Sequence, residues 1–328
     1  MPFRALRAFD QDGRVHTRAV ELSLDDLAPG DVVIRVTHSS LNYKDALAVT
    51  GRGRIFRRLP LVPGIDLAGT VVESADPRVP PGAAVLANGM GLGETHDGGY
   101  AERARLPGDW IVPMPDGLDP AGAMALGTAG FTAALALDLL EEKGQTPALG
   151  PIVITGATGG VGSVAVRLLS SRGYEVIAVS GRPEHADWLR RLGAAHVETP
   201  ESLATGSKPL DRARFGGAID NVGGPLLAAL LPHIVEWGSI VSIGLAGDAK
   251  FSTTVYPFIL RGVSLLGASS ANCPMPRRIK LWRRLASEWK FETSDLVSQT
   301  IALQDVPSRA VDLLERRLHG RAVVRVEA

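Results

Sequence analysis

A cluster of glycines offers the clearest chemistry in the sequence. Residues 152–163 read IVITGATGGVGS, so that Gly156, Gly159 and Gly162 recur at every third position. Residues without side chains let a pyrophosphate approach the backbone, and the start of a following helix supplies unpaired N–H donors. A tight turn that needs positive φ angles would show the same pattern. Because a strand-like run precedes the glycines and a helix-like run follows, we predict a dinucleotide site made by Gly156, Thr158, Gly159, Gly160, Val161 and Gly162.

The end of the next strand-like run indicates which dinucleotide binds. Enzymes that use NAD carry an acidic residue about 20 positions after the glycines, where it binds the ribose 2′-hydroxyl. This chain has Ser180, Gly181 and Arg182 there instead. A carboxylate would repel a 2′-phosphate, whereas a hydroxyl and a planar guanidinium would bind it. We therefore predict NADPH as the cofactor. The same three residues could also simply form a loop before the helix that starts at Pro183.

These motifs need a sheet to position them, and the second half of the chain predicts one. Beyond Gly150, short apolar runs alternate with helical patterns. The predicted strands are 152–155, 175–180, 217–221 and 238–244, and the predicted helices are 161–172, 184–192 and 225–236. This alternation predicts right-handed crossovers and an α/β fold with a doubly wound parallel sheet of the Rossmann type.

The first half predicts a different architecture. Short β-branched runs, such as 31–37 and 67–73, lie between Pro-Gly breaks, as in an irregular antiparallel barrel. Residues 120–137 carry no charge, and their length would suit a membrane span. They are rich in Ala, Gly and Thr and only weakly hydrophobic, so we predict a buried helix and no membrane span. A helix over 277–289 and a strand over 322–326 complete the prediction.

Composition narrows the class of protein. The chain has 328 residues, more than one hydrophobic core usually serves, which predicts two domains. Its 35 basic and 35 acidic residues cancel, so a general nucleic-acid partner is not expected. The single cysteine, Cys273, cannot form an internal disulfide. The first 20 residues contain no apolar targeting core, and we predict a cytoplasmic protein without a membrane partner.

With these motifs identified, the chain resembles the medium-chain dehydrogenase/reductase superfamily, and within it the zinc-independent acrylyl-CoA reductase and quinone oxidoreductase branch. The matching segments are 39–45 (SSLNYKD), 61–69 (LVPGIDLAG), 127–132 (GTAGFT), 157–162 (ATGGVG), 179–182 (VSGR) and 257–263 (PFILRGV). The resemblance implies a GroES-like β-barrel catalytic domain over 1–122 and 297–328 and an NADPH-binding Rossmann domain over 123–296. It also implies a homodimer that pairs through an edge strand within 257–267.

Many relatives in this superfamily bind zinc, and this chain departs from their ligand set. They carry a cysteine where Asn42 stands and a Gly-His-Glu where this chain has Gly64, Ile65 and Asp66. They also carry a lobe of four cysteines. Asparagine and isoleucine do not replace a thiolate and an imidazole on Zn²⁺, so we expect no metal.

Without a metal to polarise the substrate, the resemblance implies hydride transfer from NADPH to the β-carbon of acrylyl-CoA or a similar α,β-unsaturated acyl-CoA. The enolate that develops needs hydrogen-bond donors. Asn42, Tyr43 and Lys44 are the candidate catalytic residues, because their segment faces the nicotinamide in this superfamily. Each could instead be structural: Asn42 within a turn, Tyr43 as a packed aromatic and Lys44 as a solvated charge.

Further binding residues follow from the resemblance alone. The remaining cofactor contacts are expected from Tyr43, Thr128, Asn221, Leu245, Ile259 and Ser270. A loop with four arginines (52, 54, 57 and 58) could bind CoA phosphates at the rim of the substrate site, with Arg57 and Arg58 as the main candidates, or could simply be solvated. Arg317 and Arg321 could likewise meet phosphates or lie on a solvated helix face. Glu198 stands where related sequences tend to carry a basic residue, so an extra 2′-phosphate contact is not expected there.

Two alternative functions remain open at this point. The same hydride chemistry would suit an NADPH:quinone or enone oxidoreductase that uses no CoA. A protein of another class, a non-catalytic redox sensor that binds NADPH, would retain the glycine-rich turn without the donors.

Overall fold

The computed structural model describes residues 1–203 and 208–326, and the chain folds into two compact units. The first unit consists of Met1–Thr128 and Ala271–Ala328, and the second of Ala129–Ser270. Residues 271–296, which we expected in the Rossmann domain, therefore lie in the first unit. They carry helix α8 (Met275–Ala286), whose buried Arg278 and Trp282 donate hydrogen bonds of 2.7 and 3.1 Å to the backbone and side-chain oxygens of Asn88. Buried polar groups need such partners, which explains why this helix packs on the first unit.

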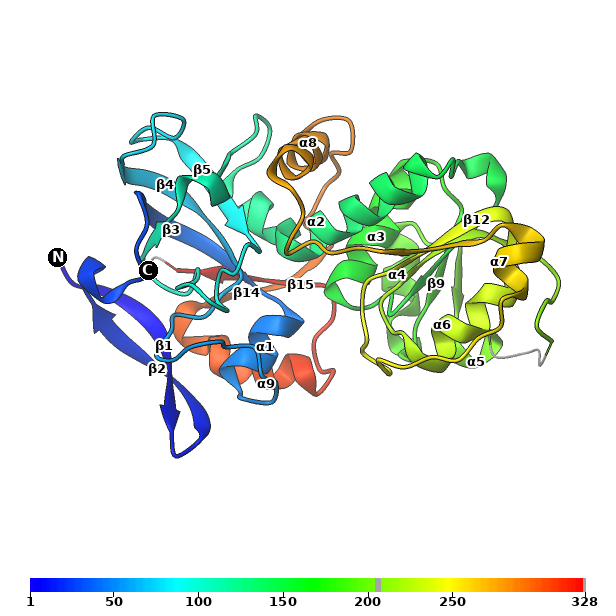
Figure 1. Ribbon diagram of the computed structural model, residues 1–328, viewed down its shortest axis with the longest axis horizontal. Coiled ribbons are helices and arrows are strands. Elements are labelled where there is room, and N and C mark those ends of the chain that lie inside the picture. Colours follow the sequence, from blue (N-terminus) through cyan, green and yellow to red (C-terminus); the bar gives the residue numbers. More distant parts are fainter. Residues whose placement is uncertain (204–207, 327–328) are drawn as a thin grey trace. The chain divides into compact units, whose positions relative to one another are not determined.

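The second unit is built on a sheet of six parallel strands (Figure 1). Their order is β10-β9-β8-β11-β12-β13, and the strands are β8 (Ile152–Thr155), β9 (Val176–Val179), β10 (His196–Glu198), β11 (Phe215–Asp220), β12 (Ile234–Ser242) and β13 (Ser264–Gly267). The helices between them are α3 (Gly160–Ser171), α4 (Ala186–Leu192), α5 (Pro200–Leu203), α6 (Gly224–Leu230) and α7 (Tyr256–Arg261). The strand order reverses beside β8, which is the order of dinucleotide-binding sheets, and the Rossmann prediction is confirmed.

One predicted element of this unit is wrong in part. The helix predicted over 225–236 ends at Leu230, because Pro232 follows within a short 3-10 turn and strand β12 begins at Ile234. An edge strand lies within 257–267 as expected: helix α7 comes first in this range, and β13 then pairs with β12 at the end of the sheet. Gly262 ends α7 with a φ of 62°, a conformation that glycine adopts without strain.

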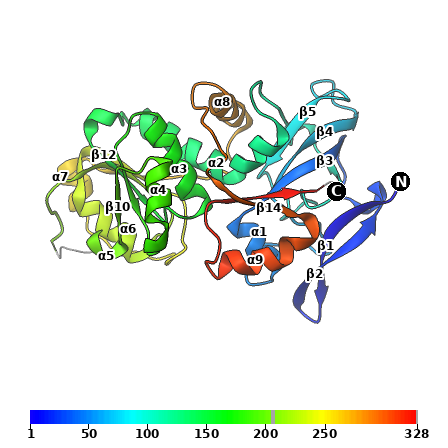
Figure 2. The ribbon, with the colours of Figure 1, turned by 180° about the vertical axis from the view of Figure 1, so that it is seen from behind.

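The first unit contains a sheet of seven strands and a separate hairpin. The sheet runs β14-β15-β3-β4-β5-β7, with β6 also paired to β3, and the hairpin is β1 with β2. The strands are β1 (Phe3–Gln11), β2 (Arg14–Leu22), β3 (Val32–Leu41), β4 (Asp66–Ser74), β5 (Ala84–Asn88), β6 (Arg103–Leu106), β7 (Val112–Pro113), β14 (Val297–Ala302) and β15 (Arg321–Arg325). Helices α1 (Tyr43–Val49) and α9 (Val306–Leu314) lie side by side (Figures 1 and 2), although they come from opposite ends of the chain.

Helix α2 (Pro120–Glu142) begins in the first unit and ends in the second. It is interrupted at Gly127, whose φ of 52° and ψ of −155° are not helical. Among the residues that the structure describes, α2 is the one helix long and apolar enough to cross a membrane, yet 89% of its apolar stretch is buried inside the protein. The prediction of a buried helix over 120–137 is confirmed.

Candidate active site

A buried carboxylate, Asp66, gathers several of the predicted residues in the first unit. Asp66 is the first residue of strand β4 and is fully buried. Its Oδ2 accepts hydrogen bonds from Asn42 Nδ2 at 2.8 Å and from the Thr128 backbone N–H at 2.9 Å, and Ser40 Oγ donates to the same atom. Its Oδ1 accepts the Thr128 hydroxyl at 2.5 Å. Asp66 therefore joins the end of β3, the start of α1 and the interrupted helix α2.

The side chain of Asn42 is fully engaged within this network. Its Nδ2 also donates to Ser40 Oγ at 3.1 Å and to Asp45 Oδ2 at 3.0 Å, and its Oδ1 accepts a bond of 3.2 Å from Arg321 Nη1. The Asn42 backbone N–H donates to Asp45 as well, so that this pair fixes the first turn of α1. Asn42 holds the network together in this structure, and its role as a donor to substrate stays a prediction.

Arg321 closes the network from the far end of the chain. It lies on strand β15 and is only 2% exposed, so the expectation that it sits on a solvated helix face is wrong. Its Nε donates a 3.0 Å bond to the Ala125 carbonyl oxygen, just before the interruption of α2. A Cβ atom on Gly127 would lie 2.6 Å from Asp66 Oδ2 and 2.9 Å from Arg321 Nη2, so only glycine fits there.

The charges in this cluster are unequal, since two carboxyl groups accompany one guanidinium. Burial and the neighbouring charge of Asp66 raise the pKa of Asp45 to about 7. Burial lowers the pKa of Arg321, while the charges of Asp66 and Asp45 oppose that shift. Burial also raises the pKa of Tyr100, whose hydroxyl donates to the Ser40 carbonyl oxygen. Asp45 therefore takes up a proton near pH 7, where an ordinary carboxyl group is ionised.

The other two predicted donors differ in how available they are. Tyr43, the first residue of α1, is 53% exposed, which excludes the packed-aromatic alternative. Lys44 Nζ forms an ion pair of 2.8 Å with Glu94, so it is not the simple solvated charge of the alternative interpretation. Of the three consecutive residues, Tyr43 presents the most accessible side chain.

The glycine-rich turn of the second unit has the shape that a pyrophosphate requires. It connects β8 to α3, and Gly156 has a φ of 60°. Gly159 caps α3, and a Cβ atom on Gly162 would lie 2.3 Å from the Gly156 carbonyl oxygen. Asn221, at the end of β11, donates its Nδ2 to the Thr155 carbonyl oxygen at 2.8 Å. Its Oδ1 is buried and has no hydrogen-bond partner among the described residues, so the turn has a spare acceptor beside it.

Ser180 and Arg182 lie against this turn. The Arg182 side chain donates from Nε to Thr158 Oγ1 at 3.0 Å and from Nη2 to the Thr158 carbonyl oxygen at 3.3 Å. Its backbone N–H donates to Ser180 Oγ at 3.1 Å. Hydrogen bonds from Arg182 thus join the loop after β9 to the turn after β8. Glu198 accepts from Ser202 Oγ at 2.7 Å and lies 3.8 Å from Arg214, so its charge has a partner of its own.

The remaining predicted contacts are spread over the second unit. Leu245 and Ile259 are both exposed, at 67% and 68%, and Ser270 is the last residue of the unit. Ile259 lies on α7, where Tyr256 and the neighbouring Trp237 are also exposed.

The two candidate arginines at the substrate rim are not equivalent. Arg58 donates to the Thr95 carbonyl oxygen at 2.9 Å and pairs with the buried Asp97 at 3.3 Å. Arg57 and Arg54 are exposed. Arg58 therefore has a structural role in the first unit, whereas Arg57 retains a charge that faces solvent.

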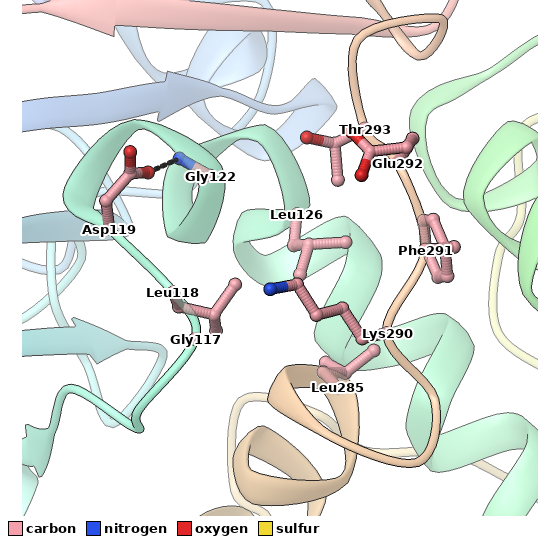
Figure 3. Close-up of a pocket in the computed structure, with 10 residues that line it drawn as sticks. All are labelled: Gly117, Leu118, Asp119, Gly122, Leu126, Leu285, Lys290, Phe291, Glu292 and Thr293. Atoms are coloured by element: carbon pink, nitrogen blue, oxygen red, sulfur yellow. Dashed lines mark hydrogen bonds between the residues drawn. The ribbon is translucent and has the colours of Figure 1, made fainter.

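A pocket of about 420 Å³ lies elsewhere in the first unit, and Figure 3 shows its lining. The amino group of Lys290 points into it beside Leu118 and Leu126, and Asp119 caps α2 through a 2.6 Å bond from the Gly122 N–H. A larger groove of about 680 Å³ runs along β1, β2 and β14. Neither the pocket nor the groove is lined by a predicted site residue. The candidate site of the first unit is therefore the Asp66 network, and that of the second unit is the glycine-rich turn.

Comparison with known proteins identifies the class of the chain. The model of the alcohol dehydrogenase GroES-like domain matches residues 28–116, and that of the zinc-binding dehydrogenase matches residues 160–287. The fold and the site define an oxidoreductase, and the chain belongs to the medium-chain dehydrogenase/reductase superfamily. Within this superfamily, the chain is similar over nearly its whole length to two curated proteins. Acrylyl-CoA reductase AcuI of Ruegeria pomeroyi is 44% identical over 97% of both chains. The Bacillus subtilis protein named "Putative quinone oxidoreductase YhfP" is 45% identical over 99% of both chains.

Solved structures agree with this placement. The yhdH oxidoreductase of Salmonella enterica, in complex with NADP, has a TM-score of 0.96 and 44% identity, with 99% of this chain and 100% of that chain covered. Bacillus subtilis yhfP, with NAD bound, has a TM-score of 0.97 and 45% identity, with 99% of both chains covered. Relatives of similar identity have thus been solved with either dinucleotide.

Zinc, which the second family description names, does not fit the side chains found here. Asn42 is committed to the Asp66 network, and Ile65 offers no ligand atom. Throughout residues 1–203 and 208–326, no group of three or more His, Cys, Asp or Glu side chains could hold a metal ion.

Asp66 was not predicted as a site residue, and Arg321 was expected only as a phosphate contact or on a solvated helix face. A signal existed for Asp66, since a charged residue that begins the apolar run DLAGTVV must be either exposed or partnered. No local signal identifies Arg321 as its neighbour, because the two residues are far apart in the sequence.

Proposed function

We propose that the chain is an NADPH-dependent reductase of the carbon–carbon double bond of acrylyl-CoA or a similar α,β-unsaturated acyl-CoA. The observation that carries this proposal is its 44% identity, over 97% of both chains, with a protein named acrylyl-CoA reductase. Identity that extends over the whole length covers the catalytic unit as well as the dinucleotide-binding one.

The residues of the second unit support NADPH as the cofactor. Gly156, Gly159 and Gly162 leave the backbone open to a pyrophosphate, and the spare Oδ1 of Asn221 accepts a hydrogen bond from a cofactor hydroxyl. Ser180 and Arg182 bind the 2′-phosphate. Thr158, Gly160, Val161, Gly181, Leu245, Ile259 and Ser270 complete the cofactor contacts that we propose. When bound, NADPH supplies the hydride for the β-carbon of the substrate.

Residues of the first unit then stabilise the substrate as it reacts. The exposed hydroxyl of Tyr43 donates a hydrogen bond to the thioester oxygen, on which negative charge develops. Asn42 fixes the start of α1 and hence the direction of Tyr43. Lys44 follows Tyr43 in α1 and is held by its ion pair with Glu94. Arg57, with Arg58 behind it, attracts the CoA phosphates.

We further propose a cytoplasmic homodimer. Strand β13 is the last strand of its sheet and leaves one backbone edge unpaired within the unit. The exposed side chains of Tyr256 and Ile259 lie on helix α7, which comes just before β13 in the chain. The exposed Trp237 lies on β12, which pairs with β13. A second copy of the chain would cover all three. Sedimentation equilibrium tests this: Leu265→Lys, on β13, should yield monomers, and a wild-type monomer would contradict the proposal.

A quinone or enone oxidoreductase is the second candidate, favoured by the 45% identity with YhfP. A non-catalytic NADPH-binding sensor is the candidate of another class. One experiment separates the three: NADPH oxidation is followed at 340 nm with acrylyl-CoA, with a simple quinone, and with neither. We expect rapid turnover with acrylyl-CoA alone. Faster turnover with the quinone would favour the second candidate, and NADPH binding without turnover would favour the sensor.

A further inference from the structure

The pocket drawn in Figure 3 holds a lysine whose charge has no partner. The amino group of Lys290 points into this pocket of the first unit. Across residues 1–203 and 208–326, the structure gives this side chain neither an ion pair nor a hydrogen bond. A Cβ atom on Gly117 would lie 3.5 Å from Lys290 Nζ, so the glycine leaves space open beside the charge. A carboxylate in that space would form a charge-assisted hydrogen bond with the ammonium group.

The walls around this charge are hydrocarbon. Leu126, in α2, and Leu285, in α8, are each 2% exposed and line the pocket. Leu118, just before α2, and Phe291, after α8, complete the apolar lining. The volume of about 420 Å³ lies within the range of small-molecule sites, about 300–1,000 Å³, which combine apolar walls with a few polar groups. A ligand that matches this pocket has an apolar body and one negative group.

Two acidic side chains also line the pocket, and neither neutralises the lysine. Asp119 accepts a 2.6 Å hydrogen bond from the Gly122 N–H, and Figure 3 shows its carboxylate turned toward that atom. Glu292 is exposed, so water and salt screen its charge. Both carboxylates nevertheless repel a ligand that carries a second negative group. The pocket therefore fits a monoanion better than a dianion.

We propose that this pocket binds a small apolar monocarboxylate. Its carboxylate pairs with Lys290 Nζ, and its hydrocarbon part packs against Leu118, Leu126 and Leu285. The site includes no residue of the Asp66 network or of the glycine-rich turn, and the inference does not depend on the proposed function.

The test uses NMR of the full chain, with isotope labels in the leucine methyl groups, and hexanoate as the probe. We expect hexanoate to shift the methyl signals of Leu118, Leu126 and Leu285 in a saturable way, with a Kd of about 1 mM, because one exposed ion pair and a few buried methylene groups contribute. Two probes with the same six-carbon chain test the charge. Hexylamine and hexanedioate should each bind about fivefold or more weakly than hexanoate.

Variants of the lysine test its role in binding. Lys290→Met keeps the apolar stem but removes the charge, so the Kd for hexanoate should rise about fivefold, the value of an ion pair in contact with water. Lys290→Arg keeps a positive charge and should bind hexanoate as the wild type does. Lys290 is exposed, so neither variant should disturb folding. Lys250→Met, an exposed lysine of the second unit, is the matched control and should leave the Kd unchanged.

Three results would overturn the inference. Methyl signals of the three leucines that stay in place while others shift would put the carboxylate at another site. An equal Kd for the wild type and Lys290→Met would show that the lysine does not recognise the carboxylate. Tighter binding of hexylamine than of hexanoate would show that the acidic side chains select the ligand. Because neither NADPH nor a thioester enters these titrations, a failure here leaves the proposed reductase function as it stands.

Discussion

Arg321 and Asn42 are joined by a hydrogen bond of 3.2 Å, although 279 positions separate them in the sequence. The bond runs from the guanidinium Nη1 to the side-chain oxygen of Asn42. It links strand β15 to the residue that starts helix α1. The candidate active site of the first unit is thus assembled from both ends of the chain.

The first prediction concerns cofactor choice. Arg182→Ala should raise the NADPH Kd about 10- to 100-fold, because a charge-assisted bond to the 2′-phosphate contributes about 1.5–3 kcal/mol. The NADH Kd should barely change. Arg190→Ala is the matched control, since Arg190 is exposed and paired with Asp187 on helix α4. Equal effects of Arg182→Ala on both cofactors in fluorescence titrations would show that Arg182 does not bind the 2′-phosphate.

Metal removal gives the second prediction. Activity should survive dialysis against EDTA or phenanthroline, because Asn42 and Ile65 cannot coordinate zinc. Elemental analysis of the purified protein checks this directly. Stoichiometric zinc whose removal abolishes turnover would contradict the assignment to the zinc-independent branch.

The sequence predicted the second unit better than the first for a physical reason. The glycine-rich turn lies between a strand and a helix that are adjacent in the chain, so residues 152–163 contain nearly all the information that the turn needs. Arg182 was also predicted as a site residue from local sequence, because it comes directly after the next strand. The local patterns missed the break at Pro232, which lies inside a run that looks continuous, and the short elements β10, α5 and α7.

The Asp66 network could not be predicted in this way. The type and position of Asn42 suggested a donor to substrate, but its amide is occupied by Ser40, Asp45 and Asp66. Which buried charges meet is decided by strand pairing between distant segments, here β15 with β3. Helix α1 was not predicted either, since its short run of seven residues lies between segments typical of strands.

Replacement of Gly127 is the third prediction, and it has an internal control. Gly127→Ala must adopt a φ of 52° and also places a methyl group within 2.6 Å of Asp66 and 2.9 Å of Arg321. Gly144→Ala has a φ of 85° but meets nothing within 4 Å. We expect the control to lower the free energy of unfolding by about 1 kcal/mol and Gly127→Ala by about 3 kcal/mol or more. Urea denaturation measures both losses. Similar losses for the two variants would mean that the side chains of Asp66 and Arg321 move aside for the methyl group at little energetic cost.

The fourth prediction concerns pH and Asp45. Its pKa is about 7 in the folded protein and 3.8 as the reference for the unfolded chain. Between these values the folded state binds more protons than the unfolded state, so the free energy of unfolding falls as the pH rises from about 4 to 7. The group contributes on the order of 4 kcal/mol to this fall. Asp45→Asn should flatten the slope, even if its stability is lower throughout. An unchanged slope, in urea denaturation at several pH values, would show that Asp45 does not titrate in this range.

The last prediction tests how the substrate is recognised, through the arginines at positions 57 and 58. If the substrate is a CoA thioester, its phosphates provide binding energy remote from the double bond, so acrylyl-pantetheine should be a much poorer substrate than acrylyl-CoA. High salt should raise KM for the CoA ester more than for an uncharged enone, because it screens exposed charges.

The variants should separate the two arginines. Arg57→Gln should reproduce the effect of salt on KM while leaving NADPH affinity and stability intact, because Arg57 is exposed. Arg58→Gln should also lower stability, since it leaves the buried Asp97 without its ion pair. The double variant should lose the salt dependence for the CoA ester altogether. Equal kcat/KM for the full and truncated thioesters, without any effect of salt, would instead favour a small enone or a quinone as the substrate, because neither carries a phosphate for these arginines to attract.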